Sequence, residues 1–177
     1  MIGARRRILF VDDEQMILTG LRNGLRRQHA RWDMVFASSG AEALAELATT
    51  DFDVVVSDMR MPHMDGVTLL ETVRRLHPLT ARIILTGYAE PSAISSIFAV
   101  THQLLSKPCR LPTLALAIDR ACKLHDVLTD PAARALVSRF PELPAPPRLY
   151  FDIALTLAYP EIPIEDITAS LERDPLT

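Results

Sequence analysis

Five short apolar runs alternate with stretches of helical spacing over roughly the first 127 residues of the chain. The runs are rich in branched residues and cover 7–11, 34–37, 53–57, 82–85 and 102–106. Stretches with apolar residues at helical spacing cover 14–29, 40–49, 65–76, 91–99 and 111–127. Parallel strands need crossover connections, and such crossovers are right-handed. The alternation therefore predicts a doubly wound α/β fold around a parallel sheet.

Local signals indicate where some of these elements begin and how deeply one of them is buried. Ser39 and Asp65 each precede a helical stretch, where a side-chain oxygen can accept from a free backbone N–H group. Glu42 stands three residues after Ser39, as in a capping box. The VVV run at 54–56 is apolar on both faces, which is typical of a central strand in a parallel sheet.

The composition is that of a folded protein, with 49% hydrophobic and 23% charged residues in 177. A net charge of −3 gives no general bias toward nucleic acid or anionic membranes. No apolar run approaches the roughly 18 residues of a membrane helix. Cys109 and Cys122 are too far apart for a redox pair and are typical of free thiols in a reducing compartment. We expect a cytoplasmic protein without membrane or direct DNA contacts.

The chain changes character after about residue 130. Residues 131–177 contain eight of the thirteen prolines, together with seven acidic and four basic residues. A proline-rich turn, PELPAPPRLY, is followed by helical patterns near 147–158 and 164–172. We therefore predict three parts: a domain at 1–127, a linker helix and turn at 128–146, and an all-helical extension at 147–177.

Polar residues of complementary chemistry follow four of the five predicted strands. Asp12 and Asp13 follow the first strand, Asp58 the third, Thr86 the fourth and Lys107 the fifth. Ligands of a doubly wound sheet bind outside the carboxyl ends of its strands, so we expect these groups to converge. Carboxylates suit Mg²⁺, one carboxylate can accept a phosphoryl group, and an ammonium neutralises the transferring oxygens. The pattern favours phosphoryl transfer.

The chain closely resembles the receiver domain of two-component response regulators. The resemblance lies in the order and spacing of four separated segments, namely VDDE, VVVSDMRMPHMDG, ILTGYAE and LLSKP. The resemblance covers about residues 5–127. It implies a five-stranded, flavodoxin-like sheet of order 2-1-3-4-5, a phosphoacceptor at Asp58, and phosphoryl contacts from Thr86 and Lys107. It also implies a sensor histidine kinase or phosphotransfer protein as donor. The chain would then be a switch, not an enzyme, apart from its own phosphorylation and dephosphorylation.

The resemblance further implies how Mg²⁺ is held. The ligands would be Asp13 directly, Asp12 through water, Asp58, and the backbone carbonyl of Arg60. Gly66 lies in the loop that the family shares and is expected to allow a tight turn there.

One position departs from the family's pattern and leaves other functions open. The residue three before the lysine is often Tyr or Phe, whose ring turns inward on activation, and here it is Leu104. The phosphorylation chemistry should survive this change, whereas a chain that has lost switching would be a receiver-like interaction module.

A third alternative is a phosphohydrolase with an aspartyl-phosphate intermediate. Enzymes of the haloacid dehalogenase type place DxDxT after the first strand, and that threonine is missing here.

The C-terminal part resembles a second family. The similarity is to regulators that carry an HDOD domain, which is a helical HD-related output domain without the catalytic metal residues. It lies in three segments, namely HQLLSKPC, LPAPPRLY and LERDPLT. Pro146 replaces the second leucine of that family's LPxLP turn. We expect the start of a truncated output domain in a fragment of a longer protein, with apolar side chains that pack on the receiver or on a second copy, namely Phe151, Ile153, Leu155 and Leu157. A homodimer is expected through these helices or through the fourth helix, fifth strand and fifth helix.

Overall fold

The computed structural model describes residues 5–87, 97 and 99–129, with side chains as far as Lys123. A five-stranded parallel sheet lies at its centre, in the order β2-β1-β3-β4-β5. The strands are β1 Arg6–Val11, β2 Trp32–Ala37, β3 Val54–Asp58, β4 Ala81–Thr86 and β5 Gln103–Ser106. The predicted fold class and strand order are confirmed.

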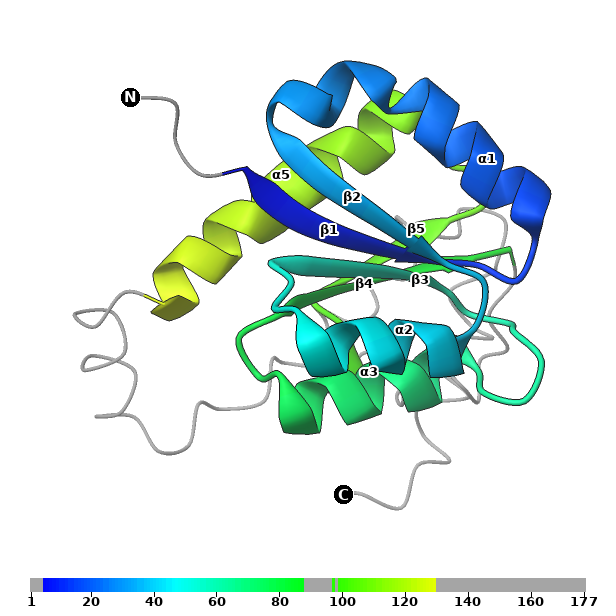
Figure 1. Cartoon of the computed structure of the whole chain (residues 1–177), viewed down its shortest axis with the longest axis vertical. Helices are drawn as coiled ribbons and strands as arrows, with labels where there is room; N and C mark the ends of the chain where they lie inside the picture. The colour runs from blue at the N-terminus through cyan, green and yellow to red at the C-terminus, as the bar shows by residue number, and fades with distance from the viewer. Residues whose placement is uncertain (1–4, 88–96, 98, 130–177) are drawn as a thin grey trace, which may run out of the picture.

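Helices cover both faces of this sheet (Figure 1). On one face lie α1 Gln15–Gly24 and α5 Leu111–Thr129. On the other lie α2 Gly40–Thr49 and α3 Gly66–Leu76. A sheet buried on both faces needs apolar residues throughout its central strands, which is the pattern that the sequence carries.

Two apolar clusters fill the spaces between the sheet and its helices. Successive strand residues point to opposite faces, so the VVV run of β3 divides between them. Val55 packs in the cluster under α2 and α3, together with Leu69. Val54 and Val56 pack in the cluster under α1 and α5, together with Ile118. All three valines are at most 1% exposed, which confirms β3 as a central strand.

The predicted helix caps are present. The Ser39 hydroxyl accepts from the Glu42 N–H at 3.2 Å, and the Asp65 carboxylate accepts from the Thr68 N–H at 2.7 Å. Glu42 differs from a standard capping box because its carboxylate reaches one residue further back. It accepts from both the N–H (2.6 Å) and the hydroxyl (2.7 Å) of Ser38, and these bonds lower the pKa of Glu42.

The helix predicted at 14–29 is divided. α1 ends at Gly24, and a 3₁₀ helix, η1 Arg26–Ala30, follows after Leu25, whose backbone leaves the α region (φ −91°, ψ 5°). A Cβ atom on Gly24 would lie 2.2 Å from a methyl carbon of Leu111, so glycine lets the end of α1 lie close to the start of α5. The periodicity of the sequence could not reveal this contact with α5.

Several predictions lie wholly or mainly outside the described residues. They are the helix at 91–99, of which only 97 and 99 are described, the linker helix and turn at 128–146, and the extension at 147–177. α5 itself continues past its predicted end at 127 to Thr129. Within the described ranges, no helix has both the length and the apolar character needed to cross a membrane.

Candidate functional site

Four strands deliver polar side chains to one edge of the sheet. Asp12 directly follows β1, Asp58 ends β3, Thr86 ends β4, and Lys107 directly follows β5. Because all the strands are parallel, their carboxyl ends share this edge, and groups far apart in the sequence meet there. Asp12, Asp58 and Thr86 are buried, and the Lys107 side chain is partly buried.

One ammonium joins two buried carboxylates. Lys107 Nζ lies 3.0 Å from Asp12 Oδ2 and 2.5 Å from Asp58 Oδ1. Asp12 is 2% exposed and Asp58 7% exposed, so neither carboxylate has much help from water. Two carboxylates and one ammonium leave the trio with one net negative charge, and an unpaired buried charge favours an additional cation.

Backbone N–H groups hold the second oxygen of each carboxylate. Asp58 Oδ2 accepts from the Arg60 N–H at 2.8 Å, and Asp12 Oδ1 accepts from the Glu14 N–H at 2.9 Å. Both side chains are therefore fixed from two sides, as a nucleophile or ligand requires. Sequence reasoning missed these two donors, because a backbone N–H group has no residue-type signal.

Further backbone bonds hold the loops that carry the site. The Lys107 N–H donates to the Thr86 carbonyl at 2.6 Å, and the Met59 N–H donates to the Leu85 carbonyl at 2.9 Å. These bonds extend the pairing of β3, β4 and β5 one step beyond the strands. As a result, Asp58 and Lys107 are positioned by the sheet itself.

Gly66 approaches the site for a reason other than the predicted one. Its φ is not positive, as holds for every glycine in the described ranges, so no unusual turn conformation requires it. A Cβ atom on Gly66 would lie 2.1 Å from the backbone oxygen of Asp58. Glycine therefore allows the start of α3 to pack against the end of β3, and the expectation of a tight turn is corrected.

The Thr86 hydroxyl is an unsatisfied polar group in this site. Its Oγ1 is buried and has no hydrogen-bond partner among the described residues. A buried hydroxyl left unpaired costs about 1–3 kcal/mol. An acceptor that enters the site, such as a phosphoryl oxygen, would satisfy it.

Lys107 keeps its charge in this environment. Partial burial alone would lower its pKa, but the hydrogen bonds that the ammonium donates to Asp58 and Asp12, and the attraction of both carboxylates, outweigh burial, so the pKa of Lys107 is raised. A permanently charged ammonium suits the neutralisation of phosphoryl oxygens and does not suit the role of a base.

The predicted metal ligands have the oxygen chemistry that Mg²⁺ prefers. Asp13 is exposed, and no set of three His, Cys, Asp or Glu side chains in the described ranges is arranged to hold a metal ion. Lys107 Nζ contacts both Asp12 and Asp58. Carboxylate and carbonyl oxygens with surplus negative charge nevertheless fit Mg²⁺, so the ligand set stays a prediction.

Leu104, at the position where the family often has an aromatic ring, is packed inward. It lies on β5 opposite Ile84 and contacts the cluster under α2 and α3, although it is only partly buried. An aliphatic side chain already inside this layer has no ring to turn.

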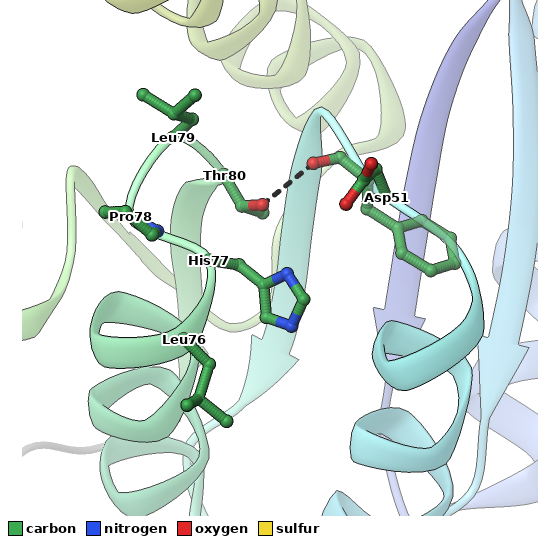
Figure 2. A pocket seen from close by; sticks show the side chains of 7 residues that line it. Asp51, Leu76, His77, Pro78, Leu79 and Thr80 are labelled. Atoms are coloured by element: carbon green, nitrogen blue, oxygen red, sulfur yellow. Dashed lines mark hydrogen bonds between the residues drawn. The ribbon is translucent and has the colours of Figure 1, made fainter.

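A shallow pocket of about 400 Å³ lies at the opposite edge of the sheet (Figure 2). It is formed by the segments that lead into β3 and β4, at 51–52 and 76–80. The Thr80 hydroxyl donates to the Phe52 carbonyl there at 2.9 Å, which ties the two segments together. The acids and the ammonium lie at the carboxyl edge, so this pocket is not part of the candidate site.

Comparison with known proteins gives consistent results. Residues 8–119 match the family model described as the response regulator receiver domain. The chain is 36% identical over 136 residues to the transcriptional regulatory protein GlrR of Escherichia coli (strain K12), covering 76% of this chain and 30% of that protein. It is 37% identical over 123 residues to the sensor kinase CckA of Brucella abortus (strain 2308), covering 67% and 13%. The chain thus spans less than a third of these relatives.

Solved structures match over a similar range. The signal receiver domain of an HD domain-containing protein from Pseudomonas fluorescens Pf-5 has a TM-score of 0.66 and 33% identity, covering 70% of this chain and 98% of that chain. A response regulator receiver domain protein from Clostridium thermocellum has a TM-score of 0.64 and 31% identity, covering 70% and 99%.

Proposed function

The chain belongs to the response regulator receiver domain family, and on this basis we propose that it is a phosphorylation switch whose acceptor is Asp58. The observation that carries the proposal is the contact of Lys107 with both Asp58 and Asp12, at the same sheet edge as the Thr86 hydroxyl, which has no partner among the described residues. An acceptor carboxylate, a fixed cation and a free hydrogen-bond donor are what phosphoryl transfer needs.

Each residue of the site has a separate role in the proposed phosphoryl transfer. An Asp58 carboxylate oxygen forms the new bond to phosphorus as the bond from phosphorus to the donor's nitrogen breaks. Lys107 neutralises a phosphoryl oxygen, and Thr86 donates to another. Family members typically use Mg²⁺, which would offset charge on the transferring group, and we propose that Asp12, Asp13, Asp58 and the Arg60 carbonyl hold it.

The proposed donor is a sensor histidine kinase or a phosphotransfer protein, since receiver domains work with histidine kinases. We propose a cytoplasmic setting, with the receiver at 1–127, the linker at 128–146 and the start of an HDOD output domain at 147–177. A homodimer through α5, β5 and the preceding helix, or through the C-terminal helices, belongs to the same proposal. The resemblance of its sequence supports the output part of the proposal.

Leu104 favours a second candidate function, a receiver-like module that binds a partner without switching. Its inward packing gives the domain no aromatic rotamer to couple phosphorylation to the surface. The complete set of Asp12, Asp58 and Lys107 favours the switch, because an interaction module has no use for buried charges.

Intact mass spectrometry with Mg²⁺ and a small acyl phosphate tests the proposal. We expect one phosphoryl group on the starting chain and none on Asp58→Asn. Asp51→Asn, which changes an exposed acid at the opposite edge, should still accept one. Failure of the starting chain to accept any would contradict the switch and favour the interaction module, whereas turnover of a small phosphate ester would favour the phosphohydrolase.

A further inference from the structure

A group of exposed cations that have no partner among the described residues lies on one side of the molecule. This basic face consists of Arg26 and Arg27 of η1 and Arg120 and Lys123 of α5. All four residues are exposed, and none forms a hydrogen bond or ion pair with another described residue. Other arginines of the domain are engaged, for example Arg31 with Asp119.

η1 and α5 lie together although about ninety residues separate them. The Arg31 guanidinium, just after η1, is 2.5 Å from the Asp119 carboxylate of α5. Leu25 and Trp32, on either side of η1, pack in the same cluster as Ile118. The end of the first helical segment and the middle of α5 therefore present one continuous surface.

The spacing of residues on α5 places its cations near that surface. Lys123 follows Asp119 by four residues and Arg120 by three, so its side chain is a neighbour of each of the other two along the helix. Leu116 precedes Arg120 by four residues and is 51% exposed, which is unusual for a large apolar side chain in this domain. The basic face thus has an apolar side chain at its border.

The chain carries a segment with complementary charge. Residues 149–177 contain one basic residue and six acidic ones, Asp152, Glu161, Glu165, Asp166, Glu172 and Asp174. Apolar residues stand between these acids, including Phe151 and Ile153. Such a mixture matches a basic surface bordered by an exposed leucine.

We propose that the basic face is the docking site for residues 149–177 of the same chain. Nineteen residues lie between Thr129, where α5 ends, and residue 149, enough for a span of roughly 60–70 Å when extended. A tether of this kind gives an effective concentration on the order of millimolar, so weak ion pairs between exposed groups suffice together. The proposal goes beyond the phosphoacceptor function and does not depend on it.

Zero-length carbodiimide cross-linking of the full chain tests this docking, because the sequence contains only two lysines. Lys107 is held by Asp12 and Asp58, which leaves Lys123 as the reactive reporter on the basic face. We expect mass spectrometry to find Lys123 joined to an acid within 149–177. The yield should fall several-fold at 0.5 M salt, on the order of what screening of exposed charges predicts.

Variants and labels make the result specific. Arg120→Glu should reduce the yield several-fold, whereas Arg75→Glu, an exposed arginine of α3 on the other face of the sheet, should leave it unchanged. Asp119, one turn before Lys123, supplies an internal control for reactivity. Lys123 joined to Asp119 but to no acid in 149–177 would overturn the proposal. In a mixture of labelled and unlabelled chains, cross-links that join a labelled chain to an unlabelled one would also overturn the proposal, because the occupant of the basic face would then be a second copy. The Asp58→Asn variant should still form the cross-link although it cannot be phosphorylated. Loss of the cross-link and loss of phosphorylation are therefore separate results.

Discussion

Lys107 is the residue on which the electrostatics of the candidate site depend. Its ammonium contacts two carboxylates that are themselves almost fully buried. The Coulomb energy of two carboxylates brought together without a cation is unfavourable, and burial increases it. Lys107 therefore stabilises the fold before any phosphoryl group arrives.

Lys107→Met should lower the free energy of unfolding by about 1–3 kcal/mol, because it leaves the buried carboxylates of Asp12 and Asp58 without their shared, partly exposed donor. If those acids hold Mg²⁺, the ion should raise the thermal midpoint more in this variant than in the starting chain, since it no longer competes with the ammonium. Thermal melts with and without Mg²⁺ measure both effects. Lys123→Met, an exposed lysine, is the control and should change stability by less than about 0.5 kcal/mol. Equal responses to Mg²⁺ in all three proteins would contradict the predicted ligand set.

At the scale of elements, the start of α3 is packed directly against the end of β3. Gly66→Ala should destabilise the domain by about 1–3 kcal/mol, because the new methyl group would overlap the Asp58 backbone oxygen. Gly20 offers a matched comparison in the middle of α1, where an added Cβ would meet nothing within 4 Å. Gly20→Ala should stabilise by about 0.5–1 kcal/mol through helix propensity. Chemical denaturation of both variants checks the opposite signs, and two changes of the same sign would refute the packing argument.

A buried arginine connects β4 to β5 and to the end of the preceding helix. Arg82 is 7% exposed, and its guanidinium donates to the carbonyls of Val100 (2.7 Å) and Thr80 (2.9 Å). Its backbone N–H donates to His102 Nδ1 at 3.0 Å. Desolvation, and then the charge of Arg82, lower the pKa of His102 to about 4. The folded domain therefore favours the neutral imidazole.

This depressed pKa predicts a loss of stability in mild acid. An unfolded histidine takes up its proton near pH 6.5, earlier than folded His102, so the stabilisation is complete above pH 6.5 and declines as pH falls toward 4. The His102 residue keeps contact with solvent, which limits the loss to about 1 kcal/mol or less. In thermal melts between pH 7.5 and 5, His102→Gln should show a shallower decline than the starting chain. Parallel curves for the two proteins would rule out this contribution.

For the molecule as a whole, sequence order and parallel topology were enough to predict the fold class and the meeting of Asp12, Asp58, Thr86 and Lys107 at one sheet edge, whereas the strand order came from the family resemblance. Asp58 and Lys107 each follow an apolar run, and a doubly wound sheet brings such positions to one edge. Contacts that depend on three-dimensional packing were not predictable. The close approach of Gly24 to Leu111 depends on the position of α5, and the role of Gly66 depends on the path of β3. The donors at Glu14 and Arg60 belong to the backbone, which is the same for every residue type.

The two apolar clusters share a single sheet, and this predicts how the domain unfolds. Trp32, the only tryptophan, is 1% exposed in the cluster under α1 and α5, whereas Leu69 is buried in the cluster on the opposite face. Leu69→Ala should cost about 2–5 kcal/mol through lost burial and the cavity left behind. Because Val54, Val55 and Val56 join both clusters in one strand, the midpoint of Trp32 fluorescence should fall with the midpoint of circular dichroism. Leu76→Ala, at a 60% exposed position of the same helix, should move neither. A Trp32 transition that stays in place while the circular dichroism midpoint falls would mean that the two layers unfold separately.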